Sequence, residues 1–392
     1  MQPFNAALIG IGGHGKTHVS RITSLVSDGL LNCVAFAEPN VAANIESYDT
    51  LTAIGAKHYT DYKEMLRCQP EIDFVVISTP IPLHKPMSIY AMEQGVHVLT
   101  EKPPAVTIQD VEAMSETAKR TGKRCAVLFQ NTSGQAFRLM LQKLKEGAIG
   151  KVLTVTGVGM WHRTDEYYAR TPWAGQLLYK GEYVLDGTVN NALAHLLNNC
   201  LIAAGSGDPG QARPKWVQAE LYRGHHIEAE DTSCIRLETS NGVKVLYYAT
   251  LCHVRQETPY IVVEGSSGSM RWSYDNTLTV ADHTGQLHQY RFEQEDLMRN
   301  MYLNFMDALR QGDGAEVYSS IDDCKSFMLA SNGAYESSRQ TYPLPADEWA
   351  NLADLFKKAS ESGKLFSELG VEWAVATKPF DLTGYKQFAL YK

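Results

Sequence analysis

The chain has 392 residues and a formal net charge of -8 at pH 7. A chain of this length is more than one hydrophobic core usually serves, so we expect two domains. The acidic balance argues against a nucleic-acid-binding protein, which needs a basic surface, and favours a small-molecule partner.

The seven cysteines are scattered and never form a C-x-x-C pair. The sequence therefore indicates neither a disulfide framework nor a zinc site, and no metal is expected. Residues 1–13 lack the basic start and long apolar run of an export signal, and no stretch approaches the roughly 20 apolar residues that span a bilayer. We expect a cytoplasmic protein that does not contact membranes.

The first third of the chain alternates short apolar runs with helical patterns. The runs are nearly apolar throughout, as in parallel strands that are covered on both faces. They lie at residues 5–10, 32–38, 72–79, 96–101 and 124–130, and a helical pattern occupies residues 107–122. This rhythm predicts a Rossmann-type, doubly wound parallel sheet in an α/β domain at residues 1–128.

From about residue 150 the pattern changes. Segments 151–161, 234–251, 259–272 and 276–292 read as strands of a mainly antiparallel sheet, with "SNG", "SSG" and "HTG" as turns. Segments 301–312 and 324–340 look helical. We assign residues 129–345 to a second, α+β domain that binds substrate, and residues 346–392 to a C-terminal tail.

A glycine-rich loop follows the first predicted strand. In "IGIGGHGKTH", Gly10, Gly12 and Gly15 have the G-x-G-x-x-G spacing and open a helix. Such glycines allow a tight turn and a close approach to a pyrophosphate, while the helix N-terminus stabilises the anion. We include Gly13 and His14 in the predicted dinucleotide site.

An acid ends the second predicted strand. Glu38, in "AFAEPN", lies at the position where a carboxylate accepts hydrogen bonds from the adenosine ribose and opposes a 2′-phosphate. The sequence thus favours NAD over NADP. The alternative is a solvated acid at the end of a strand.

Three motifs in order resemble the Gfo/Idh/MocA oxidoreductases, the family of glucose-fructose oxidoreductase and inositol dehydrogenase. They are "GIGGHG", the stretch "ISTPIPLHKPMSIYAMEQGVHVLTEKPPAVT" and "NNALAH", and the resemblance covers about residues 5–345. It implies a Rossmann domain followed by a domain with a large open sheet, and oxidation or reduction of sugar or polyol carbons with NAD or NADP. It also implies a cofactor cleft lined by Thr79, Pro80 and His84, although His84 could instead cap the next helix.

The resemblance gives Lys102, in "LTEKPPA", the central role. It implies that this lysine reaches the substrate oxygen beside the nicotinamide, with Glu101 and Pro103 shaping the strand end. Independently, parallel sheets bind ligands beyond the carboxyl ends of their strands, where this segment lies. An amine there would stabilise an alkoxide. The alternative is a solvated loop charge.

A predicted helix at residues 186–205 carries a polar stripe of Asn191, His195 and Asn198 or Asn199. The resemblance implies that this histidine takes part in proton transfer, but the family commonly has an acid where this chain has Asn191. The proton acceptor is then either His195 or Asp186, and Asn191 would orient the substrate or the imidazole.

Aromatic and basic residues concentrate in "WHRTDEYYARTPWAG", residues 161–175. Such side chains suit the apolar faces and hydroxyl rim of a sugar, but they also form cores and interfaces. The best substrate-binding candidates are Arg163, Tyr168 and Trp173, together with Lys102, Asn191 and His195.

These observations favour an NAD-dependent oxidoreductase acting on a CH–OH group of a sugar, sugar acid or cyclitol. The alternatives are a glycosidase that uses NAD for transient oxidation and elimination, and a non-catalytic regulator that senses NAD and sugar. The presence of Lys102 does not favour the regulator. By analogy with the family, we expect a homo-oligomer.

Overall fold

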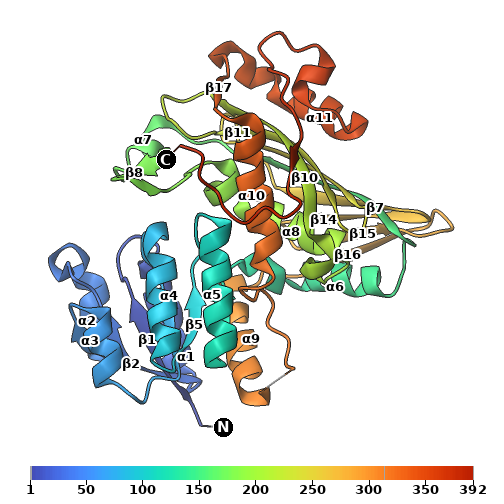
Figure 1. Ribbon diagram of the computed structural model, residues 1–392. Helices are drawn as coiled ribbons and strands as arrows, with labels where there is room; N and C mark the ends of the chain where they lie inside the picture. Colours follow the sequence, from blue (N-terminus) through green and yellow to red (C-terminus); the bar gives the residue numbers. More distant parts are fainter. Residues whose placement is uncertain (1, 313, 392) are drawn as a thin grey trace. The chain divides into compact units, whose positions relative to one another are not determined.

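The structure is a computed structural model that describes residues 2–312 and 314–391 (Figure 1). Its described residues group into two compact units. Unit 1 contains the chain up to Ala105 together with Asp110–Gln130 and Asp296–Asp322. Unit 2 contains Val106–Gln109, Asn131–Glu295 and the chain from Asp323 onward.

Unit 1 is built on a parallel sheet with the strand order β3-β2-β1-β4-β5-β6. Its strands are β1 (Phe4–Ile9), β2 (Leu31–Ala37), β3 (Lys57–Tyr59), β4 (Phe74–Ile77), β5 (His97–Thr100) and β6 (Cys125–Val127). The connecting helices are α1 (Gly15–Ser27), α2 (Ile45–Ala53), α3 (Tyr62–Cys68), α4 (His84–Glu93) and α5 (Ile108–Thr121). The predicted Rossmann-type sheet is therefore confirmed, and only the short β3 lacked a clear sequence signal.

One further helix belongs to unit 1 although it comes late in the chain. Helix α9 (Leu297–Gln311) buries Met301, Tyr302 and Phe305 in the same core as Leu8 and Ile22. The sequence analysis placed this segment with the substrate domain, because its apolar spacing shows that it is helical but not which sheet it covers.

Unit 2 contains a large sheet with the order β16-β15-β14-β13-β7-β12-β11-β10-β17. Its strands are β7 (Val152–Met160), β10 (Pro214–Arg223), β11 (Thr232–Thr239), β12 (Lys244–Thr250), β13 (Tyr260–Gly265), β14 (Gly268–Ser273), β15 (Thr277–Ala281), β16 (Leu287–Arg291) and β17 (Tyr342–Pro343), with β18 (Phe380–Asp381) paired to β10. Neighbouring strands are antiparallel except β7 with β12 and β10 with β17. The mainly antiparallel second sheet is thus confirmed.

Helices cover both faces of the centre of this sheet. The helices of unit 2 are α6 (Gln135–Lys145), α7 (Asp165–Tyr168), α8 (Ala194–Ala204), α10 (Cys324–Ser338) and α11 (Leu352–Ser362), and a short hairpin joins β8 (Leu178–Tyr179) to β9 (Glu182–Tyr183). Gly157 and Gly159 of β7 face α8, where a Cβ atom would meet the side chains of Leu196 and Leu193. Since side chains alternate along a strand, Val158 points to the other face, where it packs in one cluster with Phe356 of α11.

The predicted helix at residues 186–205 begins later than expected. Residues Thr188–Ala192 form a π-helical turn, Leu193 leaves helical geometry, and α8 starts at Ala194. The expected stripe on one helix face was therefore wrong for Asn191, which lies in the π turn and not in α8. Such turns are rare and often occur at functional sites.

Candidate functional site

The glycine loop of unit 1 connects β1 to α1. Gly10 has φ +85°, and a Cβ atom there would lie 2.2 Å from the carbonyl oxygen of Ser78, so the turn requires glycine. A Cβ at Gly15 would lie 2.4 Å from the carbonyl oxygen of Gly10. At Gly12 the nearest atom would be Oδ1 of Asn44, at 2.7 Å. The loop is as tight as the G-x-G-x-x-G spacing predicted.

Glu38 lies directly after β2 and faces this loop. Its Oε2 accepts a hydrogen bond from the backbone N–H of Ile11 at 3.2 Å, and its Oε1 accepts one from Asn40 at 2.8 Å. These bonds fix the carboxylate beside the glycine loop and leave lone pairs on both oxygens. The position fits a group that accepts hydrogen bonds from ribose hydroxyls, and the dinucleotide loop and the acid therefore suit NAD together.

Glu101, after β5, is the centre of a buried polar cluster. Its Oε1 lies 2.9 Å from Nε2 of His18 and 3.2 Å from Nε2 of His14. Nδ1 of His18 lies 2.7 Å from the hydroxyl of Tyr302. Burial acts to raise the pKa of Glu101, but the hydrogen bonds and charges of His14 and His18 hold its pKa well below the usual range. Glu101 is therefore an anion fixed at the strand end.

This anion positions the backbone of Lys102. Oε2 of Glu101 accepts a hydrogen bond from the Lys102 N–H at 3.1 Å, and the lysine is half-buried. The peptide bond between Lys102 and Pro103 is cis. The hydrogen bond to the fixed carboxylate therefore holds the main chain of Lys102 in place at the end of β5.

His84 links the loops that follow β4 and β5. Its Nε2 is 2.8 Å from the carbonyl oxygen of Thr79 and its Nδ1 is 2.8 Å from that of Pro103. Burial lowers the pKa of His84, against the effect of its hydrogen bonds with these two carbonyl oxygens. Thr79 and Pro80 precede the short 3₁₀ turn Ile81–Leu83, which leads into α4. Cofactor contact by these three residues stays a prediction.

In unit 2 the π turn rests on a buried carboxyl group that sequence analysis missed. Glu230 is fully buried; its Oε1 lies 2.9 Å from the backbone nitrogen of Val189, and its Oε2 lies 2.6 Å from the hydroxyl of Tyr335. A Cβ atom at Gly187 would lie 2.1 Å from this carboxylate. Burial raises the pKa of Glu230 to about 7 against the effect of these hydrogen bonds. Nothing in the sequence distinguishes it from a surface glutamate.

Asp186 is engaged by several donors. Its Oδ2 accepts hydrogen bonds from Arg170 at 2.9 Å and from the backbone N–H of Gly175 at 2.8 Å, and its Oδ1 accepts a short one from Asn191. Asn191 therefore contacts Asp186, one of the two candidate proton acceptors, and its role in orienting the substrate or the imidazole stays a prediction. His195 is the second residue of α8 and is 7% exposed.

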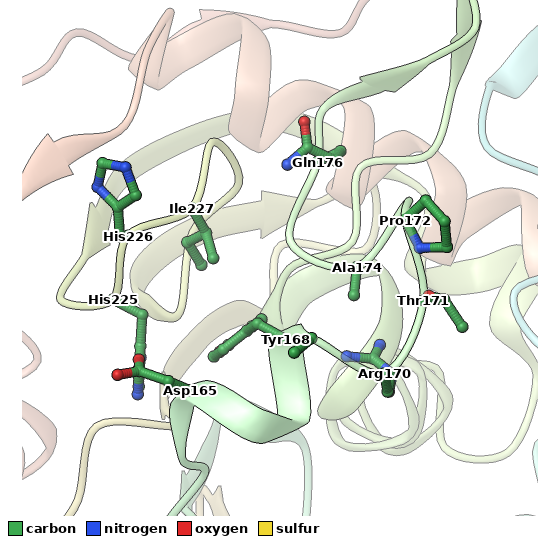
Figure 2. A pocket seen from close by; sticks show the side chains of 11 residues that line it. Asp165, Tyr168, Arg170, Thr171, Pro172, Ala174, Gln176, His225, His226 and Ile227 are labelled. Carbon is green, nitrogen blue, oxygen red and sulfur yellow. The ribbon is translucent and has the colours of Figure 1, made fainter.

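The aromatic segment surrounds a cavity of ≈ 570 Å³ in unit 2 (Figure 2). Tyr168 and Arg170 line it, whereas Arg163 and Trp173 are absent from the described lining residues. The guanidinium of Arg163 lies 5.0 Å from the ring centre of Trp161, and that of Arg170 lies 5.4 Å from the ring centre of Trp173. The structure therefore groups the basic and aromatic residues, but brings only part of the predicted set to the cavity.

Two family models match this chain. Residues 4–129 match the family model described as "Oxidoreductase family, NAD-binding Rossmann fold", and residues 137–271 match the C-terminal domain model of the same GFO/IDH/MocA family. The described residues contain no helix with the length and apolar character needed to cross a membrane.

Two curated relatives match part of this chain. A glycosyl hydrolase family 109 protein of Shewanella pealeana is 32% identical over 161 residues, which cover 39% of this chain and 34% of the relative. The α-N-acetylgalactosaminidase of Shewanella oneidensis is 29% identical over 157 residues, with the same coverage of 39% and 34%. The chain thus spans about a third of the length of these relatives.

Solved structures share the fold over most of the chain. The WlbA dehydrogenase of Bordetella pertussis, in complex with NADH and UDP-GlcNAcA, has a TM-score of 0.69 at 24% identity, over 86% of this chain and 97% of that one. Levoglucosan dehydrogenase in complex with NADH has a TM-score of 0.73 at 21% identity, with the same coverage of 86% and 97%. With both domain models matched in order, the chain belongs to the Gfo/Idh/MocA oxidoreductase family.

Proposed function

We propose that this protein is an NAD-dependent oxidoreductase that acts on a CH–OH group of a sugar, sugar acid or cyclitol. The observation that carries the proposal is the carboxyl edge of the parallel sheet in unit 1. Gly10 follows β1, Glu38 follows β2 and Lys102 follows β5. Because all these strands are parallel, their ends meet at one edge, which is where such sheets bind ligands.

The residues at the carboxyl ends of these strands would bind different parts of the cofactor. Gly10, Gly12, Gly13, His14 and Gly15 form the loop that receives the pyrophosphate, and Glu38 binds the ribose. Bound NAD would supply the chemistry of hydride transfer, as it does in the complexes of WlbA and levoglucosan dehydrogenase with NADH. Unit 1, which includes Asp296–Asp322, would act as the nucleotide domain and unit 2 as the substrate domain.

Lys102 acts on the substrate oxygen. Its ammonium stabilises the negative charge that develops on the hydroxyl oxygen as the proton leaves. Glu101 holds the backbone of Lys102 and is itself kept ionised by His14 and His18. This contact supports the proposal, because it gives the acid before the lysine a positioning role at the end of a buried strand.

His195 takes up the proton. The support is indirect: Asp186, the alternative acceptor, already accepts hydrogen bonds from Arg170, Gly175 and Asn191. The Asp186 carboxylate is thus engaged by an arginine, a backbone N–H and an amide, whereas histidine is the commonest general base. Asn191, Arg163, Tyr168 and Trp173 would contact the sugar.

A second candidate is a glycosidase that oxidises its substrate transiently and returns the hydride after elimination. The match to glycosyl hydrolase family 109 relatives favours it, but at 32% identity over 161 residues the support is partial. We further propose a cytoplasmic homo-oligomer, by analogy with the family.

One screen separates these functions. Polyols, aldoses, sugar acids and aryl glycosides are incubated with NAD, and NADH absorbance and released aglycone are recorded together. Net NADH without aglycone supports the dehydrogenase. Aglycone without net NADH supports the glycosidase, and no turnover with retained NAD binding supports a regulator.

A further inference from the structure

Three side chains with metal-ligating atoms meet at one edge of the large sheet in unit 2. His225 follows β10, Asp231 precedes β11, and Cys252 follows β12. β10, β11 and β12 are antiparallel neighbours. The C-terminal ends of β10 and β12 and the N-terminal end of β11 therefore lie side by side. All three residues are buried, with exposures of 8%, 0% and 0%.

The donor atoms of these residues converge. Nδ1 of His225 lies 2.8 Å from Oδ2 of Asp231 and 3.6 Å from Sγ of Cys252. The three donor atoms all lie within 4.8 Å of one another. Ligand atoms bound tetrahedrally to a single zinc ion at about 2.0–2.3 Å each lie roughly 3.3–3.8 Å apart, so Nδ1 and Sγ already have such a separation, whereas Nδ1 and Oδ2 are at hydrogen-bond distance and would move apart on binding.

The second ring nitrogen of His225 limits which protonation states the cluster can have. Nε2 lies 3.0 Å from the carbonyl oxygen of Arg163, so it must carry a proton to make a hydrogen bond. A neutral ring then has a lone pair on Nδ1, which would face the Asp231 carboxylate without a proton between them. The group between Nδ1 and its neighbours can then be a second ring proton, the thiol proton of Cys252 or a cation.

A second ring proton and a cation would each place positive charge beside the fully buried carboxylate of Asp231. A second ring proton would satisfy the histidine and the carboxylate, and the Cys252 thiol could then donate to the same carboxylate. A cation would instead be bound by the ring nitrogen, the carboxylate and the sulfur together.

We propose that His225, Asp231 and Cys252 form a binding site for Zn²⁺ or another thiophilic divalent cation. The nitrogen, oxygen and sulfur donors match zinc, and a histidine ligand that donates its other N–H to a backbone carbonyl is the usual outer-shell arrangement. Binding replaces the thiol proton of Cys252 and the proton on Nδ1 of His225, so it releases protons. Because the three ligands are scattered along the chain, their spacing does not resemble a metal-binding motif.

The site borders the cavity of Figure 2. His225 and Tyr168 both line this cavity, and their rings are 4.8 Å apart between centroids. The hydroxyl of Tyr168 is buried and has no hydrogen-bond partner among the described residues. Three protein ligands beside a cavity leave the fourth position of a tetrahedral ion to water or to a molecule in the cavity.

The other group of metal-type donors in the described residues is a weaker candidate. His14, His18 and Glu101 also lie close together. However, both ring nitrogens of His18 already have partners, the Tyr302 hydroxyl and the Glu101 carboxylate, that a neutral ring satisfies. This group therefore needs no cation and serves as the internal comparison.

The test measures metal directly. The purified full chain is stripped with a chelator, reloaded with zinc or cobalt and desalted. We expect about one zinc per chain, a thiolate-to-cobalt absorption band in the cobalt form, and an X-ray absorption spectrum of the zinc form with one sulfur among nitrogen and oxygen ligands. His225→Gln and Cys252→Ser should lose the metal, and Cys252→Ser should lose the cobalt band.

Two matched variants act as controls. Cys234→Ser removes another buried thiol, in the neighbouring strand β11, and His18→Gln disrupts the other donor group; both should keep the metal. Folded wild-type protein that binds no zinc would overturn the proposal and leave a protonated His225 paired with Asp231. Loss of metal in His18→Gln, or a zinc spectrum without sulfur, would overturn it as well, and the spectrum needs no variant to fold.

Discussion

Arg170 and Asp186 form an ion pair in unit 2, with Nη2 of the arginine 2.9 Å from Oδ2 of the aspartate. The carboxylate is only 2% exposed, whereas the arginine side chain is 26% exposed. Removing one partner of a buried pair leaves an uncompensated charge, which costs several kcal/mol, roughly 3–5. The contacts with Arg170 and Gly175 support the proposal that Asp186 holds the loop that contains both residues and that His195 accepts the proton.

This assignment predicts different kinetics for two variants. His195→Ala should lower kcat and flatten its pH dependence near neutrality, because the acceptor of the chemical step is lost. Asp186→Asn should mainly raise KM and lower thermal stability, since the loop that it anchors carries substrate-binding candidates. Steady-state kinetics across pH on a substrate found in the screen would check both. The opposite pattern would make Asp186 the acceptor.

Lys102 provides the sharpest catalytic prediction. Lys102→Ala should lower turnover by roughly 10²-fold or more and leave NAD affinity nearly unchanged, because charge on the substrate oxygen develops only towards the transition state. Lys102→Arg, which keeps the charge but not the shape, is the matched control and should recover part of the rate. Near-normal turnover of Lys102→Ala would indicate that Lys102 is a solvated loop residue without a catalytic role.

Glu38 should decide between the two nicotinamide cofactors. Its fixed carboxylate opposes a 2′-phosphate, so NAD should bind more tightly than NADP by about tenfold or more, which is about 1.4 kcal/mol. Fluorescence titration with each cofactor measures this ratio. Glu38→Gln keeps the shape and removes the charge, and it should bring the two affinities closer. Tighter binding of NADP by the wild type would be incompatible with the role of Glu38.

Gly12 should be essential for cofactor binding but not for folding. A side chain there would first meet Asn44, whose Oδ1 lies 2.7 Å from the position of a Cβ atom. Gly12→Val should abolish NAD binding while circular dichroism stays unchanged. The double variant Gly12→Val with Asn44→Ala removes this internal contact. If its NAD binding returned, the defect would come from Asn44 and not from the approach of a pyrophosphate.

Glu230 should make stability depend on pH. Burial raises its pKa from an ordinary value near 4.5 to about 7 in the folded protein. The folded state therefore holds its proton more tightly, so the stabilising contribution is complete below pH 4.5 and is lost as pH rises to about 7. A shift of this size corresponds to about 3 kcal/mol. Chemical denaturation between these two pH values measures it.

The matched comparison for this prediction is a pair of glutamine variants. Glu230→Gln should remove this component of the pH dependence, so its stability relative to wild type should rise as pH increases. Glu264→Gln changes an exposed glutamate of β13 and should leave the wild-type pH dependence in place. If the free energy of unfolding of wild type and of Glu230→Gln changed with pH in the same way, the pKa of Glu230 would be at its ordinary value.

The sequence alone determined the parts of this protein whose signals are local. The glycine loop, Glu38 and Lys102 each follow an apolar run, and parallel strands bring their ends to one edge, so spacing along the chain was enough to predict this edge. The turns of the second sheet were likewise visible, because glycine and polar residues between alternating strands mark hairpins locally.

Only the tertiary structure decided the features that depend on distant partners. Helix α9 joins the first core through Met301 and Phe305, and its sequence period does not say which sheet it covers. Glu230 is about 40 residues from the turn that it holds, and its burial raises its pKa only because the chain folds over it. His225, Asp231 and Cys252 meet because three antiparallel strands end or begin at the same edge. A chain pattern encodes periodicity and turns, whereas burial and convergence of side chains are set by packing between segments that are far apart in sequence.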